Sequence, residues 1–438
     1  MEWYTALTLL LGGTVCLLLL GLPVAFAFFS ANILGAYLFM RGGVGLSLQP
    51  IEYALSVTKF SLVPVALFIL MGEILFQTGV AQNSIKAIDK LITRVPGRLA
   101  MVSIAGGTVF SSLSGSTLAN TALLGQLMLP DMLKRGYHPT LAMGPIMAVG
   151  GIAMLIPPSA LAVLLASLAE RSISNLLLAG IVPGIIMAAL FVVYVWLRVL
   201  LRPDDAPPSE SPTLSGWARW QPFFIDVLPL FTIFVVVVGS IFFRIAAPEE
   251  AAALGCIAAV LVSAIYKKLN WSNLHRALKE TAKITIMLLF IIAGSLTFAQ
   301  ILQISGATSG VMQALSEFDY TLVQAMVVMV LILLFLGCFM DQISMMLLTL
   351  PFFLPISDSL GADPIWLLVL MLIAMEVSLL TPPFGLLLFV MKGVCPPHLT
   401  IIQIYRAALP FIGLEMAVAG LVIAVPGVAL WLPEMLSG

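Results

Sequence analysis

The sequence predicts an all-α polytopic membrane protein, and three observations support this fold class. Of the 438 residues, 61% are hydrophobic and 9% are charged, and the mean hydropathy is +1.12. A soluble domain carries about 25% charged residues. Apolar runs of roughly 20 residues, the length that crosses a bilayer, recur along the chain. Small, hydroxylated and proline residues interrupt several of these runs, which predicts broken helices there.

The first half of the chain contains simple spans and two interrupted ones. We predict spans at 5–22, 23–40 and 57–75, followed by an amphipathic interface helix at 82–98. Residues 99–133 are interrupted at Ser114-Gly115-Ser116, which predicts a re-entrant hairpin with its tip at mid-membrane. Residues 141–168 are interrupted at Pro157-Pro158, where two prolines free carbonyls in the preceding turn. A span at 175–201 and a polar linker at 202–221 complete this half.

The second half repeats the design. Spans are predicted at 223–243, 251–266 and 284–302, with a basic connector at 267–283 and a short arm at 309–320. Residues 322–355 are interrupted at 337–341, residues 365–395 at Thr381-Pro382-Pro383, and the run 401–432 closes the chain. The number of residues between Gly115 and Pro157 is nearly the same as that between Gly337 and Pro382. Broken helices at matching places in two halves indicate the midplane site of a transporter.

The basic residues predict the orientation, because short cytoplasmic loops are enriched in Lys and Arg. The connector 267–283 is placed in the cytoplasm, the first hairpin enters from that side, and the second enters from outside. The amino terminus is then external, and the halves are inverted repeats. The predicted organisation is 1–54, scaffold spans; 55–183, first transport repeat with its tip near 114–116; 184–282, scaffold spans and cytoplasmic connectors; 283–410, second inverted repeat with its tip near 337–341; and 411–438, terminal span.

The interrupted segments are the candidate Na+ sites. Sodium is a hard cation that prefers oxygen, and a mixture of hydroxyl, amide and freed carbonyl groups suits a weakly bound ion. Small residues also allow close helix packing, and Asp341 has the alternative of hydrogen bonding to Ser344 or Gln342. The candidate sodium ligands are Ser114, Gly115, Ser116, Asn120, Gly150, Gly151 and Pro157 at the first break, and Gly337, Asp341, Thr381 and Pro382 at the second.

The substrate is expected between the two hairpin tips. Half-helix amino termini direct positive dipole ends at an anion there, and no intramembrane arginine supplies an obvious clamp. The candidate substrate residues are Ser112, Ser116, Pro158, Thr381 and Gly385. Glu376 also lies in an apolar run, where a carboxylate is costly. We interpret it as a proton sensor or as a residue that holds the broken helix.

The order and spacing of several motifs resemble the large membrane subunit of TRAP (tripartite ATP-independent periplasmic) transporters. The motifs are Gly21-Leu22-Pro23-Val24-Ala25-Phe26-Ala27, Pro64-Val65-Ala66-Leu67-Phe68-Ile69-Leu70-Met71-Gly72, Ser114-Gly115-Ser116, Lys134-Arg135-Gly136-Tyr137, Ile156-Pro157-Pro158-Ser159 and Thr381-Pro382-Pro383-Phe384-Gly385.

The resemblance implies Na+-driven uptake of a small organic acid across the bacterial inner membrane by an elevator motion. It also implies two protein partners, a small four-helix membrane subunit and a periplasmic substrate-binding protein. The chain departs from the family at four positions. The family often has an acidic residue where this chain has Asn120, Asn where it has Ala374 and Leu387, and Gly where it has Ser378.

Other functions fit the sequence less well. An intramembrane hydrolase needs a nucleophile with a base, and no His or Lys is expected at the depth of Ser111–Ser116. His138, His275 and His398 lie far apart, so we expect no metal other than Na+, no organic cofactor and no enzymatic activity. No motif indicates nucleic-acid binding, and paired proline breaks favour alternating access over a channel. The alternative is a free-standing sodium- or proton-coupled organic anion carrier of the same architecture.

Overall fold

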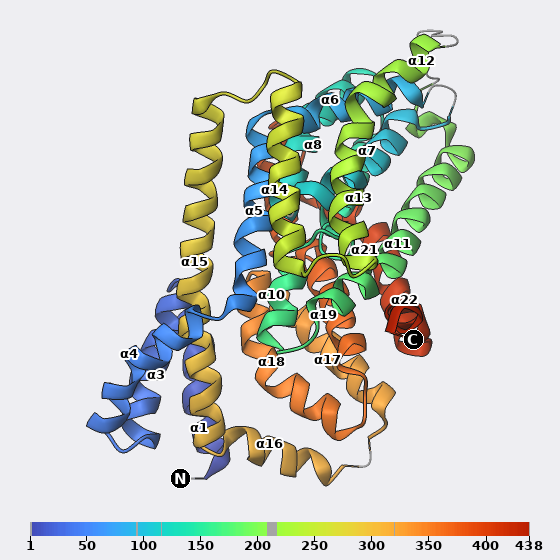
Figure 1. Ribbon diagram of the computed structural model, residues 1–438. Helices are drawn as coiled ribbons and strands as arrows, with labels where there is room; N and C mark the ends of the chain where they lie inside the picture. The colour runs from blue at the N-terminus through green and yellow to red at the C-terminus, as the bar shows by residue number, and fades with distance from the viewer. Residues whose placement is uncertain (1, 93–94, 115, 208–216, 319, 438) are drawn as a thin grey trace.

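The chain folds into helices throughout the part described by the computed structural model, which covers residues 2–92, 95–114, 116–207, 217–318 and 320–437. No strand occurs within these ranges (Figure 1). Within the described residues, six helices are long and apolar enough to cross a membrane. They are Phe60–Gln77, Ile173–Leu201, Trp220–Phe242, Pro248–Ile265, Trp271–Ile304 and Ile401–Ala424. The predicted polytopic membrane class is therefore confirmed.

The amino-terminal helices pack beside one long helix. They are α1 (Trp3–Leu7), η1 (Thr8–Gly12), α2 (Gly13–Leu19), α3 (Val24–Phe39) and α4 (Gly43–Val57). We predicted no helix between the spans 23–40 and 57–75, whereas the structure has α4 there. Gln49 Nε2 donates to the Asn32 carbonyl at 2.6 Å, and Asn32 Nδ2 donates to the Gly294 carbonyl at 2.7 Å. These bonds connect α4, α3 and α15 (Trp271–Ile304), which lie together in Figure 1.

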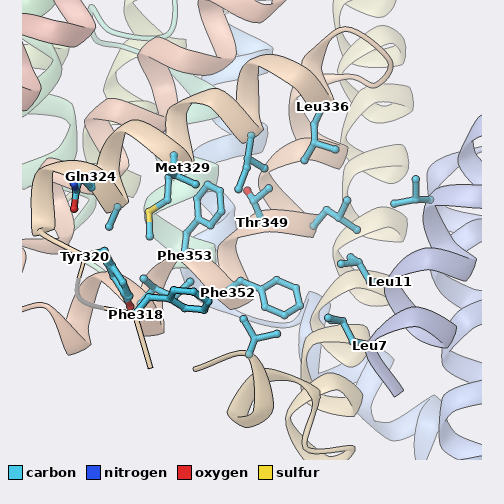
Figure 2. A pocket seen from close by; sticks show the side chains of 17 residues that line it. Leu7, Leu11, Phe318, Tyr320, Gln324, Met329, Leu336, Thr349, Phe352 and Phe353 are labelled. Carbon is cyan, nitrogen blue, oxygen red and sulfur yellow. The ribbon is translucent and has the colours of Figure 1, made fainter. Parts of the chain in front are cut away.

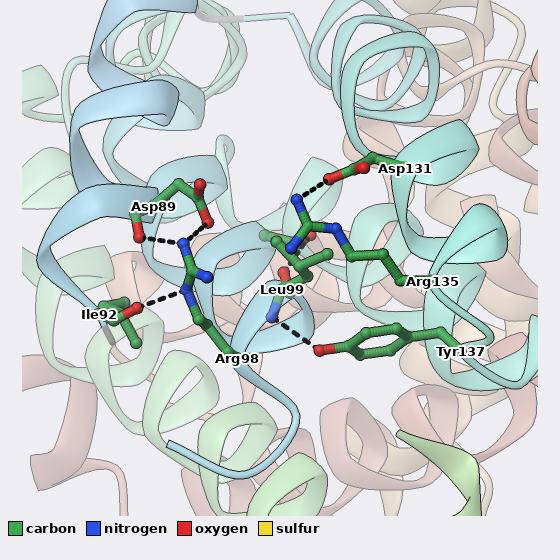
Figure 3. A network of polar contacts seen from close by, with 8 residues as sticks. Asp89, Ile92, Arg98, Leu99, Asp131, Arg135 and Tyr137 are labelled. Atoms are coloured by element: carbon green, nitrogen blue, oxygen red, sulfur yellow. Dashed lines mark hydrogen bonds and ion pairs between the residues drawn. The ribbon is translucent and has the colours of Figure 1, made fainter. Parts of the chain in front are cut away.

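The predicted interface helix is α6 (Val80–Leu91), which follows η2 (Phe60–Leu62) and α5 (Val63–Gln77). It ends earlier than the predicted 82–98, because Arg98 already begins the next helix. Arg98 is 3% exposed and donates to the Asp89 carboxylate and to the carbonyls of Asp89 and Ile92, each at 2.6 Å (Figure 3). This arginine therefore ties the end of α6 to the helix that it starts.

Two helix pairs occupy the predicted hairpin positions. The first is α7 (Arg98–Ser114) with α8 (Thr117–Lys134), and the second is α17 (Leu322–Gly337) with α18 (Gln342–Ser359). Tyr137 Oη accepts from the Leu99 amide at 3.2 Å, and Asn120 bonds to Ser111, so α7 and α8 run antiparallel (Figure 3). α17 has 16 residues, about 24 Å at the helical rise. It is therefore shorter than a typical hydrocarbon core of roughly 30 Å.

Two broken helices form the centre of the molecule. α9 (Pro139–Ile152) stops before the proline pair and resumes as α10 (Ala160–Leu168), while α19 (Pro364–Leu380) resumes as α20 (Leu386–Val394). Every residue of α9 from Leu141 and of α19 from Ile365 is buried, as expected for helices that are apolar on all sides. The peptide bonds Pro157–Pro158 and Pro382–Pro383 are both cis. The two breaks thus have matching positions and matching local geometry.

The remaining helices surround this centre. They are α11 (Ile173–Leu201), η3 (Pro203–Asp205), α12 (Trp217–Pro222), η4 (Phe223–Val227), α13 (Leu228–Phe242), α14 (Pro248–Ile265), α16 (Ala307–Ser316), α21 (Ile401–Ala424) and α22 (Gly427–Ser437). Two predictions are corrected here. The connector 267–283 is not a loop, because α15 begins at Trp271, and the run 401–432 is two helices divided at Val425-Pro426.

The loops with clustered basic residues meet at one end of the bundle. Lys268 Nζ lies 3.2 Å from Asn83 Oδ1 and 3.4 Å from the Gly79 carbonyl, which joins the connector to α6. The His138 amide donates to the Asp205 carbonyl at 2.9 Å, which joins the loop after α8 to the segment after α11. That this end faces the cytoplasm stays a prediction from the basic residues.

Candidate functional site

The junction between α7 and α8 and the end of α9, together the first break, bring oxygen atoms of these three helices together. Ser111 Oγ donates to the Val149 carbonyl at 2.7 Å, and Asn120 Nδ2 donates to Ser111 Oγ and, at 3.5 Å, to the same carbonyl. Gly150 must be glycine here, because a Cβ would overlap Thr121 Oγ1 and lie 3.2 Å from the Thr117 carbonyl. α8 and α9 therefore approach closely at a polar contact inside the protein.

Several of these oxygens have no hydrogen-bond partner. Asn120 Oδ1, Thr117 Oγ1 and Thr121 Oγ1 are buried and accept or donate no hydrogen bond within the described part of the chain. Asn120 and Thr121 are 0% exposed. A buried polar atom without a partner costs roughly 1–3 kcal/mol. The cluster has the oxygen chemistry that a small hard cation or a buried water requires.

The turn between α17 and α18 and the end of α19, together the second break, place a carboxylate beside backbone carbonyl groups. Asp341 precedes α18 and accepts from the amides of Ile343 and Ser344 at 3.0 and 3.1 Å, and from Ser344 Oγ. Gly337 packs against Ser378, since a Cβ there would overlap the Ser378 side chain. Cys338 Sγ lies 3.7 Å from the Pro382 carbonyl. The end of α17 and the end of α19 therefore meet at this break.

The two breaks also contact each other's half of the chain. A Cβ on Gly150 would lie 3.6 Å from Leu387 Cδ1, so the end of α9 meets the start of α20. Gln342 Nε2 lies 3.3 Å from Met154 Sδ, so the start of α18 meets the break that follows α9. Four helix interruptions from two distant parts of the sequence therefore converge on one region.

The predicted residues occupy this region to different extents. Ser116 accepts from the Ala119 amide at 3.4 Å and caps α8, and Pro157 and Pro158 are buried in the first break. Gly151 ends α9 against Glu376, whereas Gly385 caps α20. Thr381 and Pro382 follow α19 and are half-buried, and Thr381 Oγ1 donates to the Val377 carbonyl at 2.8 Å. Ser112 and Ser114 end α7, but their side chains, and all of Gly115, lie outside the described residues.

We predicted no role in the site for five polar residues at these contacts: Ser111, Thr117, Thr121, Ser378 and Glu415. Ser111 lies one turn before Ser114, and Ser378 lies one turn before Thr381, so helical spacing could have found them. Thr117 and Thr121 directly follow the named residues Ser116 and Asn120. Glu415 was missed within the apolar run 401–432, although a carboxylate in such a run is itself a signal. Glu376 forms no hydrogen bond with the described residues and packs against Gly151 of α9. Its interpretation as a proton sensor or as a residue that holds the broken helix stays a prediction.

A cavity of about 560 Å³ lies elsewhere, between the amino-terminal helices and the second hairpin (Figure 2). Leu7, Leu11, Phe352 and Phe353 line it, and Tyr320 and Gln324 lie at its margin. Its walls offer almost no polar atoms for an organic anion. Within the described residues, no cluster of three His, Cys, Asp or Glu residues that could bind a metal was found either.

The fold and its paired helix breaks define a multi-pass helical membrane protein of the transporter class. The family model of the tripartite ATP-independent periplasmic transporter, DctM component, matches residues 11–428. The chain belongs to this family, as a TRAP transporter large permease subunit, and the resemblance described above is confirmed.

Characterised relatives cover nearly the whole chain. The C4-dicarboxylate TRAP transporter large permease protein of Pseudomonas aeruginosa is 30% identical over 86% of this chain and 87% of its own length. The ectoine permease of Halomonas elongata is 29% identical, covering 98% and 99%. The sialic acid permease of Vibrio cholerae is 28% identical, covering 97% and 98%.

Solved structures show the same fold at low sequence identity. The YdaH transporter of Alcanivorax borkumensis superposes with a TM-score of 0.62 at 16% identity, over 87% of this chain and 89% of that one. MtrF of Neisseria gonorrhoeae superposes with a TM-score of 0.60 at 14% identity, over 89% and 85%. These likenesses concern the fold alone.

Proposed function

We propose that the chain is the large permease subunit of a sodium-coupled, binding-protein-dependent TRAP transporter. It imports a small organic acid across the bacterial inner membrane, and the two hairpins with their broken helices move together as an elevator. The observation that carries the proposal is the group of unpartnered oxygens at the first break. Asn120, Thr117 and Thr121 are buried beside Gly150, in the place where broken helices expose ligands in transporters.

Sodium suits these groups better than a polyvalent cation. The first site offers amide, hydroxyl and carbonyl oxygens without a carboxylate among the three unpartnered side chains, so an ion of single charge that dehydrates easily is favoured. The second site would use Asp341 with carbonyls freed around Gly337, Thr381 and Pro382. The intervening region, near Ser116, Pro158 and Gly385, would receive the substrate at the amino ends of α8, α10 and α20.

The substrate class and the partners follow from the family. The three relatives are named for C4-dicarboxylates, ectoine and sialic acid, compounds that all carry a carboxylate. A periplasmic binding protein would deliver the substrate, and a small four-helix membrane subunit would complete the transporter. Membership in the family favours this assembly over the free-standing carrier.

The sodium site is tested by removing one unpartnered oxygen. Thr121→Val preserves the shape of the side chain and deletes Oγ1, whereas Thr232→Val is the matched control on α13, where Oγ1 bonds to its own helix at the exposed surface. An ion at ten times its Kd adds about 1.4 kcal/mol to the free energy of unfolding. We expect sodium chloride, compared with choline chloride, to raise the Tm of the wild type and of Thr232→Val, and to raise that of Thr121→Val less. Equal Tm values of the wild type in both salts would contradict the proposal.

A further inference from the structure

Two carboxyl groups from different helices are enclosed in the protein interior. Glu376 lies on α19 and Glu415 on α21, and both side chains are 0% exposed. None of their four carboxyl oxygens has a hydrogen-bond partner within the described part of the chain. An ionisable group in a membrane interior is expensive, and it persists where it is paired or functional.

The helix register brings the two glutamates together. Trp366 Nε1 donates to the Val422 carbonyl at 2.8 Å, and Tyr405 Oη donates to the Pro383 carbonyl at 2.8 Å. These bonds fix α19 and α21 as antiparallel neighbours and place Glu376 opposite Ile412, one helical turn from Glu415. One turn is about 5.4 Å, so the register allows two side chains of glutamate length to meet between the helices.

Among the described residues, no cationic side chain forms an ion pair with either glutamate. α9 presents Gly151 to Glu376, and neither α9 nor α10 carries a titratable side chain. The charged side chains on the neighbouring helices have other partners or lie near helix ends. Arg198 of α11 bonds to Asp205, Asp341 caps α18, Asp358 pairs with Arg171, and Lys392 of α20 bonds to the Leu399 carbonyl. Arg406 lies near the start of α21, and Glu434 lies near the end of α22.

Two buried carboxyl groups without a cationic partner are suited to binding a proton. Two ionised carboxylates side by side in a low-dielectric interior repel each other, whereas one proton allows the first group to donate to the second. A metal ion would need several further ligands, and no group of three His, Cys, Asp or Glu residues that could hold one occurs among the described residues. We propose that Glu376 and Glu415 form a proton-binding site that bridges α19 and α21. This site does not depend on sodium coupling.

The proton is tested by infrared spectroscopy of the purified full-length chain in choline chloride. A protonated carboxylic acid has a carbonyl-stretch band that is separate from the carboxylate bands. We expect this band in the wild type at neutral pH, where exposed carboxyl groups are ionised, and in the control Glu317→Gln, which removes an exposed carboxyl group. The double variant Glu376→Gln/Glu415→Gln retains two hydrogen-bonding amides in the same volume and should lack the band.

The outcomes separate this proposal from the proposed function. A wild-type spectrum without the band at neutral pH, or a band that survives in the double variant, would overturn the proton-binding site and leave the sodium experiment untouched. Where the double variant does not fold, the single variants Glu376→Gln and Glu415→Gln decide. A shift of the band frequency in both singles supports the shared proton, and an unchanged frequency in both overturns it.

Discussion

Asp341 shows how one side chain has two roles open to it. The structure confirms the hydrogen bond to Ser344 that the sequence offered as an alternative to sodium binding, while Gln342 instead contacts Met154. The carboxylate also caps α18 through two backbone amides. Because Asp341 is only half-buried, these bonds do not use all of its oxygen lone pairs, and its negative charge remains available to an ion.

The charge and the cap can be separated by substitution. Asn caps helices about as well as Asp, so Asp341→Asn should change the free energy of unfolding by less than about 1 kcal/mol while weakening the sodium-dependent rise in Tm. Asp363→Asn is the matched control, because Asp363 caps α19 with the same pattern, accepting from Ile365 and Trp366. Equal sodium-dependent shifts in the two variants would exclude Asp341 as an ion ligand.

At the scale of elements, local signals predicted where helices stop. Ser114 ends α7, Gly337 ends α17 and both proline pairs fall in breaks, because Gly and Pro act on their own backbone. Local signals failed for α4, whose sequence includes Gln49, Pro50 and Glu52 and does not read as a membrane span. Its polar side chain Gln49 is satisfied by Asn32, and a contact of that kind cannot be read from a single stretch of sequence.

The end of α6 depends on one arginine. Arg98→Ala would leave the Asp89 carboxylate and two carbonyls without their donor, and hydrogen bonds to charged groups contribute roughly 1.5–3 kcal/mol. We expect a loss of about 2 kcal/mol and faster amide hydrogen exchange in α6. Arg135→Ala is the control, because its ion pair with Asp131 is exposed and such pairs contribute about 1 kcal/mol or less. Unchanged exchange in α6 of Arg98→Ala would show that α6 is held by its apolar face alone.

At the scale of the whole molecule, the candidate site consists of contacts between distant parts of the chain. Ser111 donates to the carbonyl of Val149, Gly150 packs against Leu387, and Gly151 packs against Glu376. The sequence predicted the breaks and their repetition, because both are local or periodic. It could not predict which oxygens remain without partners, because that depends on side-chain register between helices that are remote in sequence.

We predict the orientation of the molecule in the membrane from the distribution of its charges. Basic loops gather at one end, where Lys268 meets α6. Glu317 follows α16, and Asp358 lies in the last turn of α18, in segments without clustered Lys or Arg. Because basic loops are retained in the cytoplasm, Lys279→Cys in a Cys16→Ser background should react with a membrane-impermeant maleimide only after the inner membrane is opened. Glu317→Cys should react in intact spheroplasts, and both positions are exposed. The reverse labelling pattern would place the amino terminus in the cytoplasm and require the first hairpin to enter from outside.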